Sequence, residues 1–185
     1  MSISPTDMTP RTERTLRIAG WLFAAGLLAL PAIAMQFSDE VDWSAADFLI
    51  AGIALGLSGG IIELGARASA NLAFRIGAVV AVGCAFLQAW INAAVGIIGD
   101  EGNPANWTYF AVVAIAAAGA VGALGNPRGL ARTMVAAASA QAIFSILHAA
   151  NGTPTIVIDA FFVLLWLLAA RLFQRSAGER TGNSA

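Results

Sequence analysis

The chain has 185 residues, 58% of them hydrophobic and 11% charged, and a mean hydropathy of +0.76. Roughly a quarter of the residues of an ordinary soluble domain are charged. This composition therefore excludes a soluble domain and predicts a protein that lies in the lipid bilayer. A net charge of −1 without a basic stripe excludes a nucleic-acid partner, and a single cysteine, Cys84, excludes a disulfide scaffold.

Six apolar runs are long enough to span a membrane, since a helix that crosses roughly 30 Å of hydrocarbon uses about 20 residues. They cover residues 17–37, 44–64, 74–99, 107–124, 131–150 and 155–173. We therefore expect an all-α polytopic bundle of six transmembrane helices that forms a single integral membrane domain over residues 1–185. The bundle would occupy residues 17–173, between tails at 1–16 and 174–185.

Local signals mark several of the predicted helix starts. Arg14 and Arg17 precede the first run, and small residues follow it, so residues 1–34 also fit a cleaved secretory signal, and this alternative stays open. Ser44 and Asp47 have the spacing of a capping box at the start of the second run. Pro154 is predicted at the first position of the sixth helix, where its missing N–H costs nothing.

The distribution of basic residues predicts the orientation of the bundle. All ten are arginines, and they fall in the two tails and in two alternate loops, whereas the other three loops and the span starts beside them carry acidic residues and no arginine or lysine. Because basic residues near short loops stay on the cytoplasmic side, we expect both termini in the cytoplasm and the acidic loops outside.

A faint internal repeat accompanies this pattern. Asp39-Glu40 followed by Trp43-Ser44 recurs as Asp100-Glu101 followed by Trp107-Thr108, a period of about 60 residues. Three helical-hairpin repeats are one interpretation. The other is that any hairpin protein has acidic outer turns and interfacial tryptophans.

Two polar stripes lie inside predicted spans, where polar groups are costly and mark candidate sites. Gln88 and Asn92 follow Cys84 at intervals of four on the third span, and Gln141, Ser145 and His148 share one face of the fifth. Counted in residues from the outer end of each span, the two stripes lie at the same depth in the membrane. Together with Asp159 they could line a polar cleft that opens outward: Gln88, Asn92, Gln141, Ser145, His148 and Asp159. We favour the alternative, interhelical hydrogen bonds that hold the bundle together.

His148, the single histidine, and Asp159, the acidic residue of the sixth span, lie close to each other in the sequence. His148 and Asp159 flank the same outer turn, so they could meet as an ion pair or as two ligands of a cation. Asp159 also lies near the positive end of its helix, where a carboxylate is favoured without a partner. One histidine cannot supply paired haem ligands and the sequence has no HExxH motif, so we expect no cofactor, no catalytic residues and no enzyme.

The acidic loops suggest a weak divalent-cation site. Like charges on one side of a small bundle repel, and oxygen-rich sites suit calcium or magnesium. Its predicted ligands are Asp39, Glu40, Asp42, Asp100 and Glu101. The alternative is that these loops only satisfy topology and face water.

Two stretches carry a family resemblance: residues 35–43, MQFSDEVDW, and residues 90–106, WINAAVGIIGDEGNPAN. They resemble an uncharacterised family of small multi-span bacterial inner-membrane proteins, over about residues 20–175. The resemblance implies a bacterial, inner-membrane location and no particular activity.

Small residues recur every fourth position in the second and third spans, a pattern that lets helices pack closely. Examples are Gly52, Gly56 and Gly60. Sequence alone therefore favours a non-enzymatic integral inner-membrane protein, either an accessory subunit of another membrane protein or a homo-oligomeric scaffold. The alternative is a channel or transporter for a small solute or cation with an acidic outer entrance.

Overall fold

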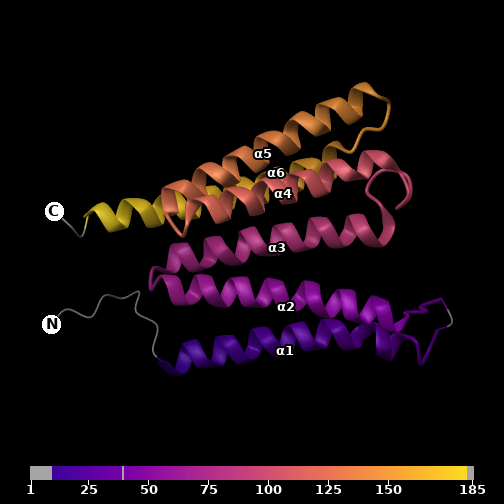
Figure 1. Cartoon of the computed structure of the whole chain (residues 1–185), viewed down its shortest axis with the longest axis horizontal. Coiled ribbons are helices and arrows are strands. Elements are labelled where there is room, and N and C mark those ends of the chain that lie inside the picture. The colour runs from indigo at the N-terminus through magenta and orange to yellow at the C-terminus, as the bar shows by residue number, and fades with distance from the viewer. Residues whose placement is uncertain (1–9, 39, 183–185) are drawn as a thin grey trace. The chain divides into compact units, whose positions relative to one another are not determined.

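The computed structural model describes residues 10–38 and 40–182, and these form six α-helices, one short 3-10 turn and no strand. The elements are α1 (Pro10–Ala34), α2 (Ala45–Ala68), α3 (Leu72–Val95), η1 (Pro104–Asn106), α4 (Trp107–Ala123), α5 (Pro127–Ala150) and α6 (Ile156–Gly182) (Figure 1). All six helices are long and apolar enough to cross a membrane. The predicted all-α fold with six helices of membrane-spanning length is therefore confirmed.

Several helix bounds differ from the predicted ones. α1 begins at Pro10 and α6 continues to Gly182, so parts of both predicted tails are helical. α3 ends at Val95 rather than at residue 99, because Gly96 adopts a φ of +70°. A Cβ at Gly96 would lie 2.4 Å from the backbone of Asp100, so only glycine fits this turn.

The start of α2 is as predicted, and the start of α6 is not. Ser44 Oγ accepts from the backbone N–H of Asp47 at 3.3 Å, and Asp47 Oδ2 accepts from the Ser44 N–H at 2.8 Å, which is the expected capping box. α6 begins at Ile156, two residues after Pro154. Thr155 precedes the helix instead, and its carbonyl accepts the Asp159 N–H at 2.9 Å.

The chain divides into two compact units, residues 1–64 and 65–185. In the first unit, α1 and α2 form a hairpin in which Trp21 lies over Gly59. Arg17 of α1 pairs with Glu63 of α2 at 2.6 Å. The single domain and the hairpin repeats expected from the sequence stay predictions.

The second unit is an up-down bundle of α3, α4, α5 and α6. α3 packs against α4 and α6, and α5 packs against the same two helices. Close approach of α4 to α5 depends on Gly119, where an added Cβ would lie 2.4 Å from Thr133. The apolar core is built mainly from Phe74, Val112, Met134, Phe162, Trp166 and Phe173.

The two ends of this bundle differ in chemistry. We call the end with the loops at 96–106 and 151–155 the loop end, because α3 and α5 finish there and α4 and α6 begin there. At the other end, Asn71 caps α3 and donates from Nδ2 to Glu179 at 2.5 Å. The side of the membrane that each end faces stays a prediction.

Candidate functional site: a buried polar network

The two predicted polar stripes meet at Gln88 of α3 and Gln141 of α5. Gln88 Nε2 donates to Gln141 Oε1 at 2.9 Å and to the carbonyl of Tyr109 on α4 at 3.1 Å. Its Oε1 accepts from Trp166 Nε1 of α6 at 3.4 Å. Both glutamines are 0% exposed, so this contact ties together all four helices of the bundle without intervening solvent.

Asp159 is the acidic centre of the site and is only 1% exposed. Its Oδ1 accepts from Gln141 Nε2 at 2.7 Å and from the Tyr109 hydroxyl at 3.0 Å, while its Oδ2 accepts from Thr155 Oγ1 at 2.6 Å. The carboxyl group also lies in the first turn of α6, whose free N–H groups favour negative charge. A buried carboxylate is thus bound by three donors.

His148 lies next to Asp159 without touching it. Its Nδ1 is 3.4 Å from Thr155 Oγ1, and its Nε2 is 3.1 Å from Thr108 Oγ1. The ring also packs against Tyr109 and Phe144. The Thr155 hydroxyl therefore stands between the histidine and the carboxylate, and neither ring nitrogen is left for a cation.

Hydrogen bonds connect these side chains into one set, which we call the buried polar network: Gln88, Thr108, Tyr109, Gln141, His148, Thr155, Asp159 and Trp166. The stripes identified Gln88, Gln141, His148 and Asp159 in advance. Sequence reasoning missed Thr108, Tyr109, Thr155 and Trp166, because none of them belongs to either polar stripe.

The remaining two residues of the predicted cleft lie outside the network. Asn92 is buried and donates from Nδ2 to the Asn106 carbonyl at 2.9 Å, while its Oδ1 has no partner among the described residues. Ser145 is half-buried and forms no hydrogen bond within the described ranges. Its position is rotated on α5 away from the line between Gln141 and His148.

Asn106 is a further residue that sequence reasoning did not single out as part of the site. Its Oδ1 accepts from the backbone N–H groups of Ile97 and Ile98 at 3.1 and 2.9 Å. Its Nδ2 donates to the carbonyls of Ile98 and Asp100 at 3.2 and 2.6 Å. One buried amide thus holds the loop that joins α3 to α4.

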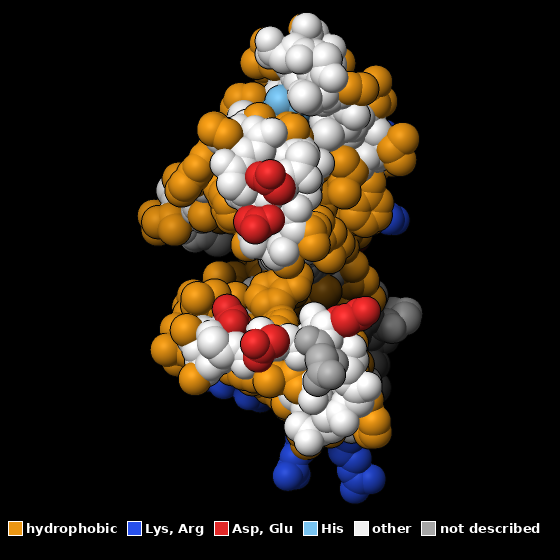
Figure 2. Space-filling view, turned by 90° about the vertical axis from the view of Figure 1, so that its right-hand side faces the viewer, with side chains coloured by type: hydrophobic (Ala, Val, Ile, Leu, Met, Phe, Trp, Pro, Cys, Tyr) orange, Lys and Arg blue, Asp and Glu red, His pale blue; other side chains and the backbone are white. Residues whose placement is uncertain are grey.

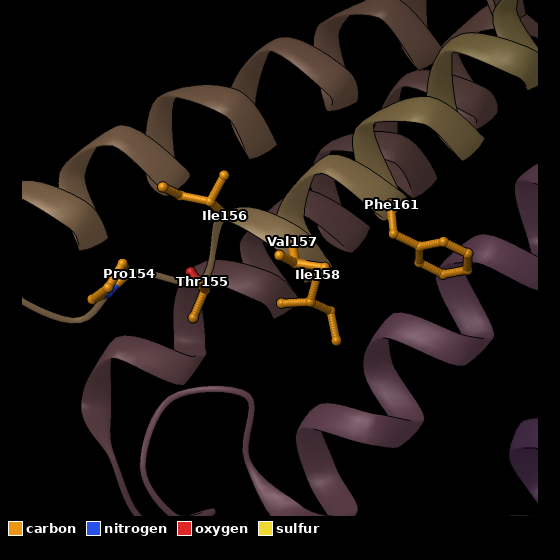
Figure 3. A pocket seen from close by; sticks show the side chains of 6 residues that line it. All are labelled: Pro154, Thr155, Ile156, Val157, Ile158 and Phe161. Carbon is orange, nitrogen blue, oxygen red and sulfur yellow. The ribbon is translucent and has the colours of Figure 1, made fainter.

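The network reaches the surface at the loop end only. His148 is 5% exposed there, and the single histidine of the chain is visible at the surface in Figure 2. A hollow of about 730 Å³ is lined by residues 154–158 and Phe161, and Thr155 is the residue of the network in that lining (Figure 3). Toward the other end, Phe162, Trp166 and Phe173 form a dry apolar core.

The acidic loops predicted a weak divalent-cation site, and the described residues of the structure form no cluster of metal ligands there. Within residues 10–38 and 40–182, no group of three or more histidine, cysteine, aspartate or glutamate residues could hold a metal ion. Asp39 lies outside the described residues. Asp100 uses its Oδ1 to accept from the Gly102 N–H at 3.0 Å. The weak divalent-cation site stays a prediction.

No family model, curated protein or solved structure matches this chain. The resemblance noted from residues 35–43 and 90–106 therefore stays a prediction as well. What can be said of function depends on the buried polar network itself.

Proposed function

We propose that this chain is a non-enzymatic integral membrane protein with a structural role, as an accessory subunit of another membrane protein or as a homo-oligomeric scaffold. The supporting observation is the direct contact of Gln88 with Gln141 at 2.9 Å, with both side chains 0% exposed. Polar groups that line a path for solutes face water. These two amides instead form hydrogen bonds with each other and with Tyr109, Asp159 and Trp166. Hydrogen bonds of this kind hold membrane helices together.

The location of the protein follows from separate evidence. Six membrane-spanning helices indicate a multi-pass membrane protein. The arginine distribution, and the absence of lysine in a chain rich in alanine and glycine, support a bacterial inner membrane with both termini in the cytoplasm. The hairpin of α1 and α2 supports a role in helix association. Gly56 and Gly60 of α2 contact no side chain of α1, so this small-residue face is open to a helix of another protein or of a second copy.

A flux assay tests the structural role. The purified chain is reconstituted in liposomes loaded with dyes for protons, potassium and calcium, and its leak is compared with that of empty liposomes. We expect equal leak rates. If the chain is a homo-oligomeric scaffold, photobleaching of the labelled protein in the same liposomes should show more than one copy in each assembly. A flux in the parent that Gln88→Leu abolishes would contradict the structural role.

One observation favours the second candidate, a cation channel or transporter with an acidic outer entrance. Asp159 is a carboxylate buried among membrane-spanning helices, and no arginine of the described residues forms an ion pair with it. Ionisable groups in this position often bind cations or protons in transporters. The flux assay distinguishes this candidate from the structural one directly.

A further inference from the structure

Four exposed arginines lie at the end of the α3–α6 bundle that is opposite the loop end. Arg128 and Arg132 are four residues apart on α5, and Arg171 and Arg175 have the same spacing on α6. Residues four apart lie on the same side of a helix, so each of the two helices presents a pair of adjacent positive charges. We call these four residues the arginine cluster.

The alignment of α5 with α6 brings the two pairs to a similar height. Gln141 Nε2 of α5 donates to Asp159 Oδ1 of α6 at 2.7 Å, and this contact relates the levels of the two antiparallel helices. At 1.5 Å per residue, the four arginines lie about 14 to 24 Å from the contact along the helix axis. The contact itself lies about 14 Å from the end of α5 at Ala150, near the middle of a hydrocarbon core roughly 30 Å thick. The arginine cluster is therefore at the level of the lipid phosphates.

The buried residues of each helix show which side the cluster occupies. Arg132 is two residues from both Leu130 and Met134, and Arg171 is two residues from Phe173, and all three apolar residues belong to the buried core. Two residues along an α-helix turn the side chain by about 200°, so both arginines point away from the core. Because α5 and α6 pack against each other (Figure 1), the cluster lies on the outer face of this helix pair.

No acidic side chain of the described residues forms an ion pair with the cluster. Glu179, the next acidic residue along α6, instead accepts from Asn71 Nδ2 at the start of α3 at 2.5 Å. By contrast, Arg17 of α1 pairs with Glu63 at 2.6 Å. Like charges four residues apart repel each other, and here two such pairs lie on adjacent helices, so an anion bound among them is stabilising.

We propose that the arginine cluster binds the headgroup of an anionic phospholipid. Guanidinium groups form forked hydrogen bonds with phosphate oxygens, and clustered basic residues at the ends of membrane helices recognise such headgroups. Exposed apolar side chains of the same two helices continue from the cluster toward the middle of the membrane: Val135, Leu164 and Leu167.

This combination distinguishes a lipid from other anions. The phosphate would contact the arginines and the acyl chains would contact the apolar side chains, whereas an acidic protein segment or a free phosphate matches the arginines alone. The lipid site goes beyond the proposed structural role and requires no assembly of copies.

Native mass spectrometry of the full chain tests the lipid site. The protein in mild detergent is mixed with equal amounts of phosphatidylglycerol and phosphatidylcholine that carry the same acyl chains, and the bound lipid is identified by mass. We expect the parent to prefer phosphatidylglycerol by about tenfold or more. Arg128→Gln combined with Arg171→Gln removes one arginine from each helix and should reduce this preference by about tenfold.

Arg11→Gln combined with Arg14→Gln is the matched control, because it removes the same charge from two exposed arginines of α1. The control should keep the preference of the parent, and both double variants should unfold at the parent's temperature in lipid-free detergent. Equal binding of the two lipids by the parent, or equal losses in the two double variants, would overturn the proposal. So would displacement of the lipid by inorganic phosphate or by soluble polyglutamate. Flux and copy number do not enter this measurement, so the lipid site can fail while the structural role stands.

Discussion

Gln88 and Gln141 are 53 residues apart in the chain and bind each other through their side-chain amides, with 2.9 Å between Nε2 and Oε1. Each amide has further partners: the Tyr109 carbonyl and Trp166 Nε1 for Gln88, and Asp159 Oδ1 for Gln141. Buried amides lose hydrogen bonds to water when the bundle forms, so their mutual contact offsets that cost and links α3 to α5 across the bundle.

Replacement of either glutamine should destabilise the bundle. Gln88→Leu leaves Trp166 Nε1 and Gln141 Oε1 buried without this partner, and an unsatisfied buried group costs about 1–3 kcal/mol. A double-mutant cycle with Gln141→Leu, measured by thermal or denaturant unfolding in mild detergent, should give a coupling of about 0.6 kcal/mol or more. Ser145→Ala on the same helix is the control, with little expected change. Zero coupling would contradict a direct contact.

Asn106 should control the loop between α3 and α4. Asn106→Ala removes four hydrogen bonds to Ile97, Ile98 and Asp100, so amide hydrogen exchange should accelerate at residues 96–100. Asn151→Ala is the matched control, since the exposed Asn151 side chain donates only to the Leu147 carbonyl. Unchanged exchange in Asn106→Ala would show that the loop does not depend on this amide.

Two glycines of α4 should respond in opposite ways to the same substitution. Gly119→Ala places a methyl 2.4 Å from Thr133 and should cost about 1–3 kcal/mol of stability through overpacking. Gly122→Ala, one turn further, meets nothing within 4 Å and should be neutral or stabilising by up to about 1 kcal/mol. Unfolding of the two variants in the same detergent measures the difference. Equal stability would mean that α4 and α5 do not approach as closely as described.

Topology can be tested by labelling single cysteines in intact cells. Cys84 is buried and can stay or be replaced by alanine. Cysteines introduced at the exposed Glu101 and Gly152 of the loop end should react with an impermeant reagent from outside. One at Gly125, at the other end of the bundle, should react only after the cells are opened. Reaction at Gly125 in intact cells would reverse the predicted orientation.

The helices were predictable because the bilayer requires long apolar runs, and the polar loops between them interrupt those runs clearly. The start of α2 was predictable from the capping box of Ser44 and Asp47, whereas the end of α3 was not, because the backbone geometry of Gly96 decides it. The helix order and the spacing of the polar residues also predict that Gln88 and Gln141 lie at one depth.

The partners of those glutamines were not predictable from periodicity. Gln88 binds Tyr109 through a backbone carbonyl, which every residue carries, and Trp166 through an indole N–H within an apolar run of α6, so nothing in the spacing of α4 or α6 marks them. Thr155 was missed because Pro154 gave the more familiar helix-start signal. Its role depends on the turn that brings His148 of α5 within reach of the first turn of α6.

The most direct test of the closed network is an experimental density map of the full chain in a lipid nanodisc, at a resolution that shows ordered water. The structure predicts that the Gln88 and Gln141 amides touch, at about the 2.9 Å found between Nε2 and Oε1, with no density between them. An ordered water or ion that separates the two amides, or a file of waters running past Trp166 toward the other end of the bundle, would contradict it.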